Sequence, residues 1–250
     1  MSNKVSIITA TYNSEDFILA TYNSLTLQSH GNWEWLICDD CSTDHTWSIL
    51  SKISDADPRV LISKNLVNSG AAISRNNSIS KASGEFIAFL DSDDIWCSKK
   101  LERQLAFMCE TIDFSFTAYR LIDEHGAPLN KFVDLNQRGA FSYEDMLRKK
   151  ATLGCSTVML RRKAFPKVTM PLLRTGQDYA TWLKLLRLGN TAYVLPEVLT
   201  SYRILPNSIS RNKFKKARRQ WQIYRTVEAL PLLKSLECFM FYAWRAIFRR

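Results

Sequence analysis

The segment that most constrains the fold is Gly84–Trp96, with the sequence GEFIAFLDSDDIW. Its apolar part, Phe86–Leu90, follows a glycine and ends abruptly at carboxylates. A continuous apolar run of this length is typical of a strand buried on both faces of a parallel sheet. In open α/β sheets, ligands bind just outside the carboxyl ends of the strands. We therefore expect Asp91 and Asp93 to lie at a ligand site, where their spacing suits oxygen ligands to one hard cation or to one ribose-plus-metal unit.

Two other predicted strands also end in polar residues. The first, 5–10, leads into Thr11-Tyr12, and the second, 33–38, leads into Asp39-Asp40. A single aspartate after a strand is usually a cap or turn residue. Acidic pairs after two strands of one parallel sheet are harder to explain by turns alone. We expect these strand ends to share one edge of the sheet and to build one site.

Strands and helices alternate through the first hundred residues, which predicts a parallel sheet built from βαβ units. Further strands are expected at 60–62 and 86–90, and helices from Glu15 after an Asn13 or Ser14 cap, over 47–53 and over 70–82. The second half is less regular and is expected to pack on the first. It predicts helices at 99–109 and 176–186, a helix start at 142–145, and strands at 113–120, 156–160, 192–195 and 199–203.

The charge of the chain is unevenly distributed. Residues 1–200 hold 22 basic and 22 acidic side chains, whereas 201–250 hold 12 and 2, so the net charge of +10 lies in the last fifty residues. The 250 residues can form one large α/β domain, with or without a small appendage. Cys38 and Cys41 form a lone C-x-x-C, so we expect reduced, mostly buried thiols. There is no signal-peptide pattern and no apolar run near the ~18 residues that span a bilayer, so we expect a cytoplasmic protein.

The basic C-terminal segment has two interpretations. Residues 211–219 hold six cations, and Pro231 opens an apparent helix with an apolar face. That face comprises Leu232, Leu233, Leu236, Phe239, Met240, Ala243, Trp244 and Ile247. Such a helix beside basic clusters suits peripheral contact with an anionic membrane, at about 1 kcal/mol per Lys or Arg near the lipid. The alternative is a helix docked on the body with a solvated basic face. A nucleic-acid partner would leave the carboxylate edge unexplained, and we expect none.

Four blocks of sequence carry a family resemblance. They are VSIITATYN, WEWLICDDCSTD, NSGAAISRNNSISKASGEFIAFLDSDDIW and GQDYATWLKLLRLG, in this order. Over about residues 4–205 they resemble the family 2 glycosyltransferases of the GT-A fold, and among these the bacterial enzymes that build O-antigen, capsule or exopolysaccharide.

The resemblance implies a Rossmann-like α/β domain, 1–205, with a mostly parallel central sheet flanked by helices. Its nucleotide-sugar-binding half would be 1–98 and its acceptor-side half 99–205, followed by a basic amphipathic helical tail, 206–250. It also implies inverting transfer from a nucleotide-diphosphate-sugar, expected to be a UDP-sugar. The acceptor would be a saccharide or lipid-linked saccharide at the inner face of the plasma membrane.

The resemblance also implies roles for individual residues. The donor would contact Ala10, Thr11, Tyr12, Asp40, Arg75, Asp91, Ser92 and Asp93, with the first four near the base. Asp91-Ser92-Asp93 matches the DxD motif, in which Asp93 binds a Mn²⁺ or Mg²⁺ ion at the diphosphate and Asp91 lies on the ribose or sugar side of the same metal site. Asp178 matches the catalytic base, but Gln177 stands where the family usually has glutamate. Trp96, Gln177 and Trp182 are expected on the acceptor side, although aromatic rings beside sheets are more often core.

The chemistry of sugar transfer explains these residue types independently. A diphosphate leaving group gathers negative charge as the glycosidic bond breaks, and a carboxylate-held divalent cation neutralises it. A positioned carboxylate that takes the proton of the acceptor hydroxyl contributes about 10²–10⁴-fold. Single displacement needs no covalent nucleophile, and His30, His45 and His125 are scattered. The alternative function is a non-catalytic sugar-nucleotide-binding subunit of a membrane-associated polysaccharide assembly complex.

Overall fold

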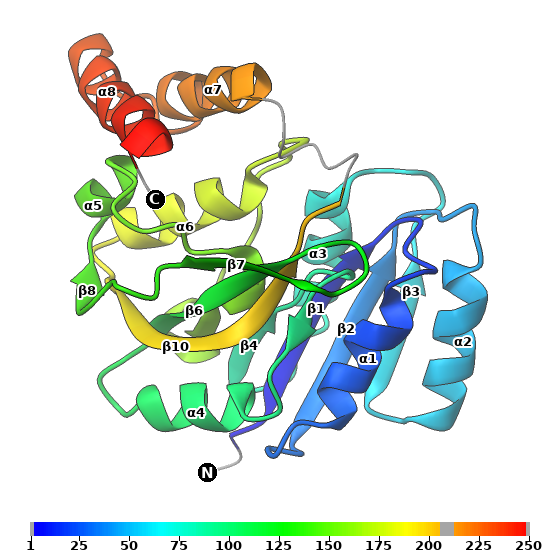
Figure 1. The fold of residues 1–250 in the computed structure, drawn as a ribbon. Coiled ribbons are helices and arrows are strands. Elements are labelled where there is room, and N and C mark those ends of the chain that lie inside the picture. The colour runs from blue at the N-terminus through cyan, green and yellow to red at the C-terminus, as the bar shows by residue number, and fades with distance from the viewer. Residues whose placement is uncertain (1–2, 206–212, 249–250) are drawn as a thin grey trace.

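The computed structural model describes residues 3–205 and 213–248, which form one sheet flanked by helices (Figure 1). The strands are β1 Val5–Thr11, β2 Trp33–Asp39, β3 Val60–Lys64, β4 Phe86–Phe89, β5 Ile95–Trp96, β6 Phe114–Ile122, β7 Pro128–Val133, β8 Ala140–Phe141, β9 Met159–Arg161 and β10 Ala192–Arg203. The helices are α1 Ile18–Thr26, α2 Thr46–Ala56, α3 Ala71–Ile79, α4 Lys100–Phe107, α5 Tyr143–Leu147, α6 Gln177–Arg187, α7 Lys213–Gln222 and α8 Leu232–Phe248. The sheet order is β3-β2-β1-β4-β9-β6-β10-β5, with β7 on β6 and β8 on β10.

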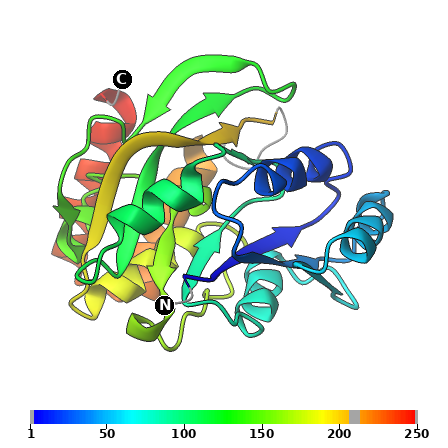
Figure 2. The ribbon, with the colours of Figure 1, turned by 90° about the horizontal axis from the view of Figure 1, so that it is seen from below.

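The first half of the sheet is parallel, as the apolar runs predict. β1 pairs in parallel with β2 and β4, and β2 with β3. Successive side chains of a strand point to opposite faces, so Ile7 packs in the cluster under α1, α2 and α4, and Ile8 in the cluster under α3 and α6. Seen from below, the sheet lies between these two helix layers (Figure 2). Burial on both faces is the reason that these strands carry continuous apolar sequence.

The second half of the sheet contains antiparallel strands. β9 runs antiparallel to both β4 and β6, and β10 runs parallel to β6 with a bulge between Leu195 and Thr200. The two closing strands expected at 192–195 and 199–203 are therefore one strand, which Pro196 interrupts without ending it. The sequence does not predict β7, because this edge strand is exposed along almost its whole length and shows no apolar alternation.

The start of α1 also differs from expectation. The helix begins at Ile18 rather than near Glu15, and no side chain caps it. Asn13 Oδ1 and the Ser14 amide bond to loop 43–46 instead, at 2.9 and 2.7 Å. The capping prediction is wrong because these two residues tie the end of β1 to the loop after β2.

The C-terminal helices pack on the body through one face. Ile223, Tyr224 and Cys238 are buried in the same core cluster as Met146 and Leu147 of α5. The Tyr224 hydroxyl donates to the Leu147 carbonyl at 2.5 Å. Ion pairs join α8 to α5 and its C-cap: Lys234 with Glu144 and Arg148 with Glu237, both at 2.7 Å. The docked-helix alternative therefore holds for this inner face, whereas the domain boundary at 205 stays a prediction. Arg211, Asn212, Arg249 and Arg250 of the predicted tail lie outside the described residues.

Two further expectations concern the cysteines and the membrane. All six cysteines are free thiols, of which Cys38, Cys155 and Cys238 are buried. Within 3–205 and 213–248, none of the helices is long and apolar enough to cross a membrane.

Gly84 is required where β4 approaches β1. A Cβ atom at this position would lie 2.6 Å from the Lys4 carbonyl oxygen and 2.7 Å from the Ser6 amide nitrogen. Both are backbone atoms and cannot move alone, so we expect Gly84→Ala to lower the free energy of unfolding by about 3 kcal/mol. Urea denaturation measures this. Gly31→Ala is the control, because nothing lies within 4 Å of its Cβ position. An unchanged urea midpoint for Gly84→Ala would contradict the packing.

The buried carboxylate of Glu34 makes stability depend on acid pH. It accepts hydrogen bonds from Lys4, Ser6 and Ser83. Burial raises the pKa of Glu34, but these hydrogen bonds lower it by more. The resulting pKa is about 2. The unfolded chain therefore binds the proton more tightly, and the stabilisation of about 3 kcal/mol is lost as pH falls from 4.5 towards 2. Urea titrations measure the free energy of unfolding, which should be higher in wild type than in Glu34→Gln near neutral pH. This difference should disappear as pH falls from 4.5 towards 2. A pH-independent difference would show that the carboxylate charge is irrelevant.

Candidate active site

The predicted edge forms at the carboxyl ends of β1, β2 and β4. Thr11 and Asp39 are paired across β1 and β2, and the Asp40 amide donates to the Thr11 carbonyl at 2.8 Å. Ala10 is partly exposed, and Tyr12 is 47% exposed. The Thr11 side chain is buried, and its hydroxyl has no hydrogen-bond partner among the described residues. The three residues predicted to line a base are therefore adjacent at one strand end, and two of them present accessible surface.

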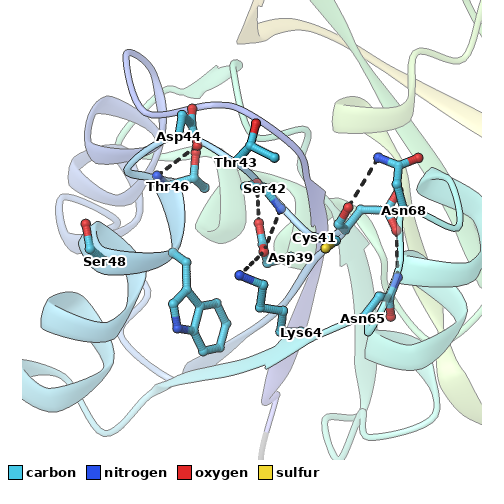
Figure 3. Close-up of polar contacts among 12 residues, drawn as sticks. Asp39, Cys41, Ser42, Thr43, Asp44, Thr46, Ser48, Lys64, Asn65 and Asn68 are labelled. Carbon is cyan, nitrogen blue, oxygen red and sulfur yellow. Dashed lines mark hydrogen bonds and ion pairs between the residues drawn. The ribbon is translucent and has the colours of Figure 1, made fainter.

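Asp39 is the last residue of β2, and its carboxylate stabilises the turn that follows. Its carboxylate accepts from the Ser42 amide at 3.0 Å and from the Ser42 hydroxyl, and Lys64 Nζ lies 3.7 Å away (Figure 3). Cys41 adopts a φ of +65°, which lets the loop turn back on the strand end. Figure 3 also shows Asp44 accepting from the Thr46 amide at the start of α2.

Asp40 organises the loop before α3. Its buried carboxylate accepts from the Ser69 amide at 2.8 Å, the Gly70 amide at 2.7 Å and Asn65 Nδ2 at 2.7 Å. Gly70 has a φ of +91°, a conformation that side chains rarely adopt. Through these bonds Asp40 fixes the start of the helix that carries Arg75. Its predicted contact with a base stays a prediction.

Arg75 lies near two predicted carboxylates. Its guanidinium donates to Asp91 Oδ1 at 2.5 Å and is 7% exposed. Burial disfavours the charged guanidinium, but Cys155, Asp91 and Asp178 raise its pKa by more than burial lowers it. Asp91 follows β4 and Asp178 lies in the first turn of α6, so residues 87 positions apart act on one cation.

The DxD segment is held by hydrogen bonds from several elements. Asp94 is buried, and its carboxylate accepts from the Ser156 hydroxyl at 2.5 Å and the Arg203 amide at 2.9 Å. The Ser156 hydroxyl also accepts from the Asp91 amide at 3.0 Å, and the Ser92 and Ser14 hydroxyls lie 2.9 Å apart. Asp94 thus links the acidic loop, Asp91–Asp94, to β10 and to the turn before β9.

Asp91 and Asp93 form a negatively charged pair suited to a divalent cation. Burial and the neighbouring Asp91 raise the pKa of Asp93 to about 6. The charges of Arg203 and Arg75 lower the pKa of Asp93, but by less. Across the described ranges, no three His, Cys, Asp or Glu side chains cluster as a metal site. A two-carboxylate set still fits Mg²⁺ or Mn²⁺, which can take its other ligands from phosphates and water.

Asp178 lies at a well-defined helix start. The preceding Gly176 has a left-handed φ of +75°, and Asp178 is partly exposed in the first turn of α6. Gln177 is 8% exposed, and its Oε1 atom has no hydrogen-bond partner in the described part of the chain. The structure therefore presents the aspartate of the Gln177-Asp178 pair and largely buries the glutamine.

The two tryptophans predicted on the acceptor side are core residues instead. Trp96 is 3% exposed, its indole N–H donates to the Ser156 carbonyl at 2.8 Å, and the Lys100 ammonium lies over its ring. Trp182 is fully buried against Phe89 and Phe114. Neither ring has a face open to a sugar, so neither can contact an acceptor directly, and the core alternative holds for both.

Some contributors to the site have no signal in the sequence. Ser156, Cys155 and Arg203 come from the turn before β9 and from the end of β10. Ser156 and Arg203 hold the acidic loop, and Cys155 lies beside Arg75. Burial raises the pKa of the Cys155 thiol well above its usual value. The antiparallel insertion of β9 beside β4 places Cys155 and Ser156 here, and the pairing of β10 with β5 places Arg203.

The sequence model of glycosyl transferase family 2 matches residues 6–169. The chain belongs to this family. It is 46% identical over 247 residues to a Bacillus subtilis (strain 168) protein named as teichuronic acid biosynthesis glycosyltransferase TuaG, covering 98% of this chain and 97% of that one. It is 37% identical over 232 residues to the Escherichia coli UDP-Glc:alpha-D-GlcNAc-diphosphoundecaprenol beta-1,3-glucosyltransferase WfgD, covering 92% and 88%.

Solved structures confirm the fold of this glycosyltransferase. S. aureus TarS 1–349 in complex with UDP-GlcNAc matches with a TM-score of 0.76 at 22% identity, over 98% of this chain and 73% of that chain. The mannosyltransferase PcManGT from Pyrobaculum calidifontis, in complex with GDP-Man and Mn²⁺, matches with a TM-score of 0.73 at 16% identity, over 98% and 70%. The predicted GT-A fold, with a central sheet flanked by helices, is confirmed.

Proposed function

We propose that this enzyme transfers a sugar, with inversion, from a UDP-sugar to a lipid-diphosphate-linked saccharide during bacterial surface polysaccharide synthesis. One observation carries the proposal: Arg75 forms an ion pair with Asp91, of the DxD segment, and Asp178, of α6, is near enough to raise the pKa of the same guanidinium. A donor-side and an acceptor-side carboxylate thus lie near one guanidinium. The names of TuaG and WfgD support the pathway, and WfgD and TarS support a UDP-sugar.

The residues divide the work of a single displacement. Asp178 takes the proton of the acceptor hydroxyl as that oxygen attacks the anomeric carbon. Attack from the face opposite the leaving diphosphate inverts the anomeric centre. Asp93, with Asp91, would hold Mn²⁺ or Mg²⁺, and a bound cation would neutralise charge on the leaving diphosphate. Arg75 orients Asp91 through their ion pair and adds positive charge beside the donor.

A transfer assay tests the proposal directly. The purified protein is incubated with a panel of UDP-, GDP- and dTDP-sugars, Mn²⁺ and a GlcNAc-diphosphate lipid, and products are identified by mass spectrometry. We expect a disaccharide lipid from a UDP-sugar, with the inverted anomeric configuration by NMR coupling. Nucleotide binding without product from any acceptor would instead favour the non-catalytic subunit.

The outer face of α8 supports peripheral membrane contact. Its exposed apolar residues are Leu232, Leu233, Leu236, Met240, Phe241, Trp244 and Phe248. α7 lies beside it at the same end of the molecule and contains five cationic and no acidic side chains (Figure 1). An apolar stripe beside basic residues fits the boundary between acyl chains and anionic headgroups.

The double variant Leu233→Glu/Trp244→Glu should bind anionic vesicles at least about tenfold more weakly than wild type. Each substitution removes an exposed apolar side chain, worth about 1.5–3 kcal/mol when buried, and adds a negative charge. Co-sedimentation with phosphatidylglycerol vesicles measures the loss. Leu188→Glu is the control, since Leu188 is 73% exposed but lies at the end of α6. Equal sedimentation of wild type and the double variant would rule out α8 as the contact.

A further inference from the structure

A basic pocket lies between α7 and the segment that leads into α6. Its volume is about 280 Å³, and Leu172–Thr175 and five side chains of residues 215–223 line it. Four of the nine lining residues are cationic and none is acidic: Arg174, Lys215, Arg218 and Arg219. The pocket contains no residue from the loops after β1, β2 or β4, where the donor-binding residues lie.

Close packing holds this pocket beside the predicted base. A Cβ atom at Gly176 would lie 2.9 Å from Arg219 Cδ and 3.2 Å from Ile223 Cδ1. Only glycine therefore lets α7 approach so closely, and its φ of +75° also favours glycine here. Gly176 is two residues before Asp178. The basic pocket thus borders the helix turn that presents Asp178.

The three arginines of the pocket, Arg174, Arg218 and Arg219, form no ion pair in the described part of the chain. Lys234 and Arg148 nearby, in contrast, are both paired with glutamates. Burial and the charge of Arg219 lower the pKa of Lys216 on the same helix. The amino end of α6 adds a partial positive charge at this border. Such a cluster is stabilised by a polyvalent anion, and arginine suits phosphate oxygens in particular.

We propose that this pocket binds the diphosphate of the lipid-linked acceptor. The inference rests on the proposed function and names the part of the enzyme that recognises the acceptor. With the diphosphate among Arg174, Arg218 and Arg219, the attached sugar lies towards Asp178. The lipid can leave towards the exposed apolar face of α8. This helix contacts α7 through the rings of Phe239 and Trp221. Base, sugar, diphosphate and lipid then follow one another along a single path.

The double variant Arg174→Gln/Arg218→Gln tests this assignment, because both arginines are exposed and the packed Arg219 stays in place. Two soluble probes are compared: decyl-diphosphate-linked α-GlcNAc and decyl α-GlcNAc, which lacks the diphosphate. For the first, we expect the variant to raise KM about ten- to a hundredfold. KM for the second probe and for the UDP-sugar should not change. Lys163→Gln/Lys167→Gln is the control, since it removes two exposed cations elsewhere.

Equal KM values for the diphosphate probe in variant and wild type would overturn the proposal. An increase in the UDP-sugar KM would also overturn it, because the pocket would then serve the donor. A variant that loses anionic-vesicle binding but keeps its KM for the diphosphate probe would assign the pocket to lipid headgroups instead.

Binding measured without a donor separates this inference from the proposed function. In calorimetry, wild type should bind the diphosphate probe at least about tenfold more tightly than decyl α-GlcNAc, and the double variant should lose that preference. If the double variant loses the preference but wild type transfers no sugar, the diphosphate site is supported and the transfer proposal is refuted. If wild type transfers sugar but binds both probes equally, the transfer proposal is supported and the diphosphate site is refuted.

Discussion

Asp178→Asn is expected to reduce the rate of sugar transfer by about 10²–10⁴-fold and to leave donor affinity nearly unchanged. Asparagine has the same shape as aspartate, so the first turn of α6 and its Gly176 approach are preserved. It cannot accept a proton from the acceptor hydroxyl, however. Steady-state transfer measures the first effect, and calorimetry with UDP-sugar measures the second.

A matched control separates this prediction from a general effect of charge. Asp55→Asn makes the same substitution at an exposed position on α2 and should leave both measurements unchanged. If Asp178→Asn retains transfer within a few-fold of wild type, Asp178 is not the base. If donor affinity falls together with the rate, its main role is to balance the charge of Arg75, which it reaches electrostatically.

The parallel half of the fold was predictable because strands that are buried on both faces have continuous apolar sequences. Residues such as Ile7, Ile8 and Phe89 have less than 1% exposure, and strands built from them cannot alternate with polar residues. Their chain order then fixes the topology, because parallel strands need crossover helices. The shared edge of Asp40 and Asp91 follows from that topology alone.

The rest of the sheet depends on contacts between residues distant in sequence. β9 contributes three residues between β4 and β6, and nothing in its own sequence indicates two antiparallel neighbours. The long strand β10 continues past Pro196 because β6 pairs with it on both sides of the bulge. Local propensity predicts a break there, and tertiary pairing overrides it.

The same distinction applies to the site. Arg75, Asp91 and Asp178 were expected from the family resemblance, and in the structure Arg75 pairs with Asp91 and lies near enough to Asp178 for that carboxylate to raise its pKa. Residue type could not show that Trp96 and Trp182 face the core, since a tryptophan beside a sheet has the same sequence whichever way its ring points. Nor could it show that three hydrogen-bond donors already occupy the Asp40 carboxylate.

Asp93→Asn is expected to abolish the metal dependence of donor binding and to lower transfer by about 10²-fold or more. The change replaces an anionic oxygen ligand with a neutral amide, which hard divalent cations bind less strongly. In wild type, Mn²⁺ should raise the melting temperature in the presence of UDP-sugar beyond the shift from the nucleotide alone. In Asp93→Asn the increment should vanish.

The geometry of the acidic loop makes this variant a clean test. The Asp93 carbonyl accepts from Arg203 Nε at 2.8 Å, and this backbone contact survives the substitution. Removing one carboxylate also relieves its repulsion with Asp91, so the variant without metal should be at least as stable as wild type. A variant that keeps the Mn²⁺ increment would exclude Asp93 as a ligand and shift the assignment to Asp91. Because the Arg75 ion pair already engages Asp91, that outcome would require the guanidinium to release it when the metal binds.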